Sequence, residues 1–240
     1  MRLIGLLNYI YTLKMKTLTL LFSLFLMCPL SVWGQSADEL LSKVSDALSE
    51  GKDDDAVSLF RQAANAGEDR TEMFYWTNVD KSSEVAPRLA DVLAVHYKEM
   101  RNYDKAYLFY KEFLQRHPED VPALVSCAEM EMMRGKEKDA VKTYEKVLML
   151  DANNLQANIF LGSYYYLQAE REKKKLEDDY KKITSPTRMQ YARYRNGLSD
   201  VYSNGYSKAK DYLQRVLQLF PSTEAGNTLE KIRKLEAEIK

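Results

Sequence analysis

The stretch LAVHYKEMRNYDKAYLFYKEFLQRHP, residues 93–118, decides the fold. Moved along the chain by 34 residues, it falls on CAEMEMMRGKEKDAVKTYEKVLMLDA, residues 127–152. Small residues then fall on small ones, such as Ala106 on Ala140, and large apolar residues fall mostly on large ones. This self-similarity predicts a structural repeat of about 34 residues.

The pattern recurs in part on both sides of this stretch. A further shift of 34 residues reaches Leu161 and Gly162, after which the register is lost until Ala209. Upstream, Ala56 and Phe60 repeat the second half of the unit. The turn between the two halves also recurs, each time with a residue that tolerates left-handed backbone and with polar capping groups ahead of an alanine. These turns are residues 51–56, 102–106, 135–140 and 205–209.

The repeat resembles the tetratricopeptide repeat, a helix-turn-helix unit with the pattern W-x2-L-G-x2-Y, then A-x3-F, then P. In that pattern a small residue on each helix lets two backbones approach, and proline ends the second helix. The chain departs from it in the tryptophan slot, which holds Leu40, Ala90, Leu124 and Asn158. The resemblance implies an all-α fold, a right-handed α-solenoid of stacked helix pairs.

The repeats predict one domain over residues 35–240. Its units are expected at about 37–66, 87–120, 121–154 and 155–221, the last with an insert at about 170–204. Residues 223–240 are predicted to form an amphipathic capping helix, because Leu229, Ile232 and Leu235 recur at helical spacing among Lys and Glu.

Two insertions interrupt the array. The first, residues 67–86, contains Phe74, Tyr75 and Trp76. The second follows Tyr165 and has two interpretations. It is either a decayed fifth repeat or, as we prefer, a helical hairpin that runs through Lys182, turns at Ser185-Pro186 and returns over residues 188–202.

Residues 1–34 are predicted to be a signal peptide. Lys14 and Lys16 form a positive segment ahead of an apolar run, and cleavage is expected before Gln35. A start at Met15 is an alternative to one at Met1, because it would by itself begin a conventional signal peptide. The expected location of the mature protein is therefore the periplasm of a Gram-negative bacterium or the medium.

Cys28 lies at the end of the apolar run, where a lipid-anchored protein would carry its modified cysteine. The residues before it, Phe25, Leu26 and Met27, are bulky where a lipoprotein signal peptidase needs small ones, so no lipid anchor is expected. Cleavage would leave Cys127 as the single cysteine and exclude an intramolecular disulfide.

Composition and motifs give little support to catalysis or to nucleic-acid binding. The chain holds 35 Lys and Arg against 35 Asp and Glu, and the lysines at 173–175 and 181–182 alternate with acidic residues. No nucleotide-binding or hydrolase motif occurs. His96 and His117 lack a second ligand at metal-binding spacing. We expect no enzyme activity, no cofactor, no metal site and no nucleic-acid partner.

The family resemblance implies a concave groove, lined by the first helix of each pair, that binds a peptide or partner protein. Transferred slot by slot, the groove residues are Val95, Lys98, Glu129, Met132, Met133, Ile159, Ser163 and Tyr166. Met and Tyr would make this surface adaptable, although Met132 and Met133 could equally pack between helices. The predicted function is a non-catalytic protein-interaction scaffold, with a role in envelope assembly as a narrower version, that meets membranes only through a partner.

A second hypothesis places binding in the insertions. Phe74, Tyr75 and Trp76 could form a recognition element, although burial is the favoured interpretation. Nine tyrosines between residues 164 and 212, with Tyr191 and Tyr194 among them, could line a site for a small ligand or carbohydrate, or belong to an enzyme.

Overall fold

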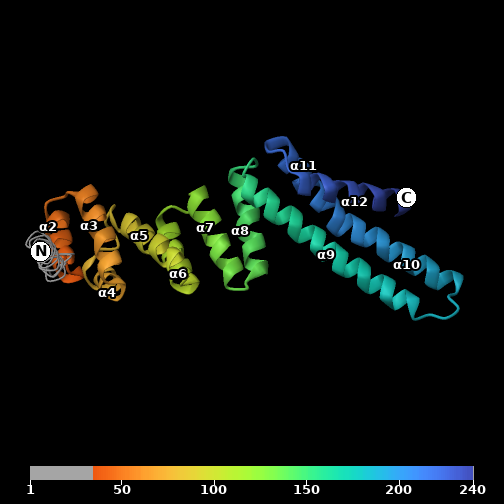
Figure 1. The fold of residues 1–240 in the computed structure, drawn as a ribbon, viewed down its shortest axis with the longest axis horizontal. Coiled ribbons are helices and arrows are strands. Elements are labelled where there is room, and N and C mark those ends of the chain that lie inside the picture. Colours follow the sequence, from red (N-terminus) through yellow and green to blue (C-terminus); the bar gives the residue numbers. More distant parts are fainter. Residues whose placement is uncertain (1–34, 240) are drawn as a thin grey trace, which may run out of the picture. The chain divides into compact units, whose positions relative to one another are not determined.

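The computed structural model of the protein describes residues 35–239, and residues 37–240 form one compact unit. The predictions about signal cleavage, Met15 and Cys28 concern residues 1–34 and lie outside the described residues. Every regular element within 35–239 is a helix (Figure 1). None of these helices is apolar over a length sufficient to cross a bilayer. They are α2 (Ala37–Ser49), α3 (Asp53–Ala66), α4 (Glu68–Asn78), α5 (Ala86–Glu99), α6 (Tyr103–Arg116), α7 (Val121–Met133), α8 (Glu137–Leu150), α9 (Leu155–Lys181), α10 (Arg188–Val201), the π-helix η1 (Tyr202–Tyr206), α11 (Ser207–Leu219) and α12 (Thr223–Ile239).

The helices stack as consecutive pairs. α2 packs on α3, α5 on α6, α7 on α8 and α9 on α11, and each later pair begins against the second helix of the pair before it. The repeated alanine of the second helix is fully buried in all four pairs. A larger side chain there would hold the two backbones apart, which is why the position stays small. These alanines are Ala56, Ala106, Ala140 and Ala209.

Three of the four predicted turns use a left-handed residue. Gly51 has φ 68°, Gly135 has φ 71° and Arg101 has φ 59°. In the second turn the left-handed residue, Arg101, lies just before the predicted range 102–106. Asn102 instead caps α6, where its side chain accepts a hydrogen bond from the Lys105 backbone at 3.3 Å.

The predicted fourth turn, at residues 205–209, does not exist. Gly205 lies inside η1, which joins α10 to α11 without a break. A side chain at Gly205 would come within 2.6 Å of the Ala169 Cβ on α9. The glycine is therefore required by close helix packing, and the turn has moved to residues 182–187.

The second insertion is thus a helical hairpin that lengthens both helices of the fourth pair. The rings of Tyr180 and Tyr194 stack across it with centroids 4.4 Å apart, and Leu176 packs where Gly197 leaves space. Lys174 and Asp178 are exposed, as this alternative requires, whereas a decayed repeat would bury them.

The first insertion forms α4, which contacts α2, α3 and α5. Phe74 and Tyr75 are buried, so they belong to the core and not to an exposed recognition element. Trp76 remains 42% exposed, with its ring stacked on Phe109 at 5.5 Å. The Lys81 ammonium lies 3.8 Å from the Tyr75 ring centroid and closes this aromatic cluster.

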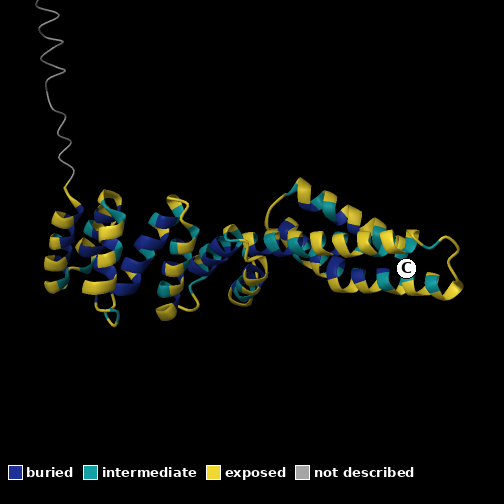
Figure 2. Ribbon diagram, turned by 90° about the horizontal axis from the view of Figure 1, so that it is seen from below, coloured by how far each residue is buried: buried dark blue, intermediate teal, exposed yellow. Residues whose placement is uncertain are grey.

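The buried residues, dark blue in Figure 2, occur along the helices from α2 to α12. At the C-terminal end, Leu229 and Ile232 of α12 are buried against the last pair and Leu235 is partly buried. α12 therefore caps the stack, as a terminal helix with one polar face can do.

Candidate protein-binding groove

A hollow of about 650 Å³ lies where α9, α11 and α12 meet. Three predicted groove residues, Ile159, Ser163 and Tyr166, line one wall. The other walls come from the second helix of the pair and from the start of the capping helix. Their residues are Leu213, Val216, Ser222, Thr223, Glu224, Ala225, Asn227, Thr228 and Lys231, and Leu167 adds to the α9 wall.

The residues of the α9 wall lie together because of their spacing along the helix. Ile159, Ser163 and Tyr166 are four and three residues apart and so share one face of the helix. Leu161 is buried on the opposite face, and a side chain at Gly162, beside the wall, would meet Leu213 at 2.9 Å. This close contact with α11 holds the α9 wall in place.

The surface of the hollow combines accessible apolar groups with a charged rim. Ile159 is 45% exposed and Leu167 is 51% exposed. Tyr166 packs edge-on against Tyr206 at 5.9 Å, and burial raises the pKa of its hydroxyl, which stays a neutral donor. Glu224 and Lys231 stand on the α12 side. Such a site suits apolar side chains that arrive on a polar backbone.

Lys98 and Glu129 do not contribute to this hollow, because they hold neighbouring first helices together. The Lys98 ammonium lies 2.5 Å from the Glu129 carboxylate, and the side chain of Gln156 donates a hydrogen bond to the same carboxylate. The chain of contacts joins α5, α7 and α9. Val95, 40% exposed on α5, lies outside the lining of the hollow.

The two predicted methionines differ in their surroundings. Met132 is partly buried against the core, so it packs between helices, as one of the two interpretations from sequence expected. Met133 is 62% exposed and lines a second hollow of about 450 Å³ beside Met100, Tyr103 and other turn residues. Of the predicted groove residues, Ile159, Ser163 and Tyr166 thus line the first hollow and Met133 lines the second.

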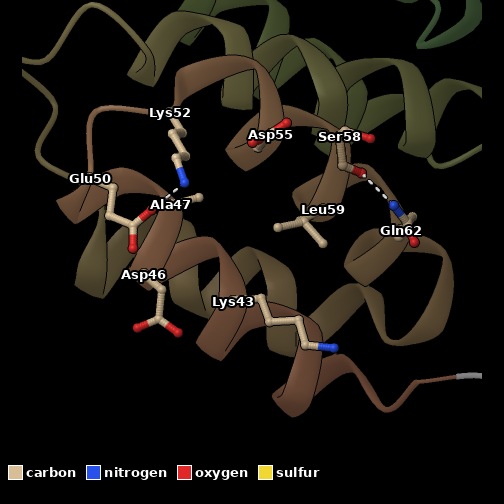
Figure 3. A pocket seen from close by; sticks show the side chains of 9 residues that line it. All are labelled: Lys43, Asp46, Ala47, Glu50, Lys52, Asp55, Ser58, Leu59 and Gln62. Carbon is tan, nitrogen blue, oxygen red and sulfur yellow. Dashed lines mark hydrogen bonds and ion pairs between the residues drawn. The ribbon is translucent and has the colours of Figure 1, made fainter.

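A third hollow, of about 380 Å³, lies between α2 and α3 (Figure 3). Its side chains are mostly charged and of both signs. Lys52 lies 2.7 Å from Glu50, and Figure 3 shows Lys43 pointing away from that pair. Because the charges do not converge on a common point, this hollow presents no recognisable ligand site.

Comparison with known proteins identifies the family. No family model and no curated protein matches the chain. A crystal structure from Bacteroides ovatus ATCC 8483, of a protein to which protein binding is ascribed, is 60% identical, with a TM-score of 0.77. The match covers 86% of this chain and 100% of that one, which places both in one family. The first helices α5, α7 and α9 begin 35 and 34 residues apart, which is the spacing of the tetratricopeptide repeat. The chain belongs to the tetratricopeptide-repeat family.

Two more distant structures also match this tetratricopeptide-repeat protein. MamA protein is 18% identical, with a TM-score of 0.33, and the match covers 64% of this chain and 89% of MamA. A thermophilic tetratricopeptide-repeat protein of Thermus thermophilus is 13% identical, with a TM-score of 0.31 and coverage of 84% of this chain and 100% of that one. These superpositions are too loose to compare individual residues.

The tyrosines of the tetratricopeptide-repeat protein do not gather in one pocket. They pair along the hairpin instead, with Tyr165 stacked on Tyr212 and Tyr191 at 6.4 Å from Tyr180. Two of their hydroxyls donate to carboxylates, Tyr165 to Glu145 and Tyr206 to Glu170. Tyr194 thus belongs to the hairpin packing, and Tyr191 lies at its edge with 51% of its surface exposed.

Cys127 is buried in a small-residue slot, and burial raises the pKa of its thiol to about 12. The thiol therefore stays protonated and unreactive at neutral pH. Among residues 35–239, no group of three His, Cys, Asp or Glu side chains is placed to hold a metal ion.

Sequence reasoning missed Leu167 and the whole α12 wall. Leu167 lies 34 residues after Met133, so the repeat register could have identified it. The α12 wall carries no comparable signal, because its position depends on how the capping helix packs on α11.

Proposed function

We propose that this tetratricopeptide-repeat protein is a non-catalytic interaction module that binds an apolar segment of a partner protein in the hollow between α9 and α12. The observation that carries the proposal is the pair of accessible apolar side chains, Ile159 and Leu167, facing a polar wall. The protein-binding role ascribed to the Bacteroides ovatus relative supports it. Apolar anchors in a concave site give most of the affinity in such recognition.

The proposal includes export to the periplasm and a scaffold role in assembly of the cell envelope. Export is supported by the signal-peptide pattern of residues 1–34. A mature chain beginning near Gln35, measured by intact mass on protein from the natural host, is the expected result. A retained residue 1 would contradict export by cleavage.

Peptides selected from a displayed random library test the hollow. We expect Ile159→Ser combined with Leu167→Ser to lower the affinity for the selected peptides by well over tenfold. Truncating an apolar anchor in an interface commonly costs about 2 kcal/mol or more of binding free energy. Calorimetric titration measures the affinity, and circular dichroism should remain unchanged because both side chains are about half exposed.

The matched control is Met149→Ser combined with Leu150→Ser, at the end of α8. These side chains are 79% and 41% exposed and do not line the hollow. They should change the affinity less than about threefold. Equal affinity of the hollow variant and the wild type would contradict the proposed site.

A further inference from the structure

The tip of the α9–α10 hairpin carries a concentration of positive charge in a chain that is balanced overall. Residues 181–199 contain five basic residues and no acidic residue. The acidic residues that alternate with lysine along α9 end at Asp179, just before the tip. The basic residues are Lys181, Lys182, Arg188, Arg193 and Arg195.

Three of these cations are available to a partner. Lys182 pairs with Asp179 at 2.8 Å, and Arg195 donates to the carbonyl oxygens of Glu238 and Ile239 at 3.0 and 2.5 Å. Lys181, Arg188 and Arg193 are exposed, and within residues 35–239 none of them has a carboxylate partner. The Arg193 guanidinium contacts the neutral Met189 sulfur, at 3.7 Å, so no carboxylate in the described part of the chain neutralises these three charges.

Apolar side chains stand beside these cations. Met189 is 66% exposed and Tyr191 is 51% exposed, and Pro186 in the loop is exposed as well. A basic cluster mixed with Tyr and apolar residues is typical of protein surfaces that meet lipid headgroups, where Lys and Arg contact phosphates and tyrosine lies at the interface.

The shape of the tip favours a flat partner. By repeat register Leu167 corresponds to Met133, the last residue of α7, so α9 continues for 14 further residues, Gln168 to Lys181. At 1.5 Å per residue, the hairpin extends about 20 Å beyond the level of the neighbouring turn. Figure 1 shows this extension, and Figure 2 shows its end as exposed. A protruding tip of two helices can touch a flat surface such as a membrane.

We propose that the tip of the α9–α10 hairpin docks on a membrane surface that contains anionic lipid, with Lys181, Arg188 and Arg193 on the phosphates and Met189 and Tyr191 at headgroup depth. This direct contact differs from the expectation from sequence that the protein meets membranes only through a partner. The inference does not depend on the groove.

Vesicle sedimentation tests the proposal. The protein, as the chain that begins at Gln35, should bind vesicles of phosphatidylcholine mixed with phosphatidylglycerol and not vesicles of phosphatidylcholine alone. We expect Lys181→Gln, Arg188→Gln and Arg193→Gln together to lower the partition coefficient about a hundredfold. Added salt should also lower the partition coefficient of the wild type, because it screens the attraction between the basic residues and the lipid.

The control removes the same charge from the middle of α9, through Lys173→Gln, Lys174→Gln and Lys175→Gln. These lysines lie about 10 Å or more along the helix from the tip, where salt screens them, so binding should fall less than about threefold. Equal melting temperatures of the wild type and the two triple variants would show that neither variant has a folding defect. Binding to neutral vesicles, or equal losses in both variants, would overturn the proposal. So would capture of poly-glutamate without vesicle binding, because it would assign the tip to an acidic protein.

Discussion

We expect Phe109→Ala to lower the free energy of unfolding by about 3–5 kcal/mol, the usual cost of removing a fully buried aromatic side chain. Phe109 is 0% exposed, and its ring lies 5.6 Å from Tyr75, 5.5 Å from Trp76 and 5.8 Å from Tyr97. It is the ring through which α4 packs on the α5–α6 pair. The substitution would leave a cavity at this junction, and rigid aromatic neighbours can close it only in part.

Urea denaturation followed by circular dichroism measures this loss. The control is Phe220→Ala, the same substitution at a side chain that is 55% exposed. Its cost should stay below about 1 kcal/mol, because surface truncations leave little cavity. Equal shifts of the two midpoints would show that Phe109 does not anchor the first insertion.

Gly205→Ala is the second substitution with a large expected effect. Alanine favours a helix over glycine by up to about 1 kcal/mol, so an exposed site would gain stability. At Gly205 the new Cβ would lie 2.6 Å from the Ala169 Cβ and 3.3 Å from its Cα. Because the Ala169 backbone cannot rotate away, α9 and η1 must separate, and we expect a net loss of about 1–3 kcal/mol.

Gly226→Ala provides a control of opposite sign. Gly226 also lies inside a helix, α12, and a Cβ there would have no atom within 4 Å. This variant should gain up to about 1 kcal/mol. Ala169→Gly should restore part of the stability lost by Gly205→Ala, since it removes the opposing methyl group. Thermal melting of the four proteins reports both comparisons, and a stabilising Gly205→Ala would refute the close approach.

The register of the stack could be predicted because it depends on local rules. Ala106 and Ala140 recur at 34 residues, and each lies where two helices of a pair must approach closely. The recurring turn pattern gave a wrong prediction at Gly205, which lies inside a continuous helix. A glycine ahead of an alanine indicates a turn from sequence alone, although it also permits close contact between continuous helices.

The candidate site was predicted only in part. Ile159, Ser163 and Tyr166 were expected in the groove and do line a hollow. Lys98 and Glu129 were expected there too, but they pair with each other across neighbouring helices. A sequence shows that a slot points into the groove, yet it does not show whether the side chain is already bound to its neighbour.

The sequence by itself determined the helix pairs, their order and their buried faces, because each depends on spacing within about 34 residues. Tertiary structure alone decided that residues 188–219 form one continuous helical arm, that Tyr75 is buried under Lys81 and that α12 closes the hollow beside Ile159. These features depend on contacts between segments far apart in the chain. Their energies come from packing and desolvation between neighbours that no local pattern specifies.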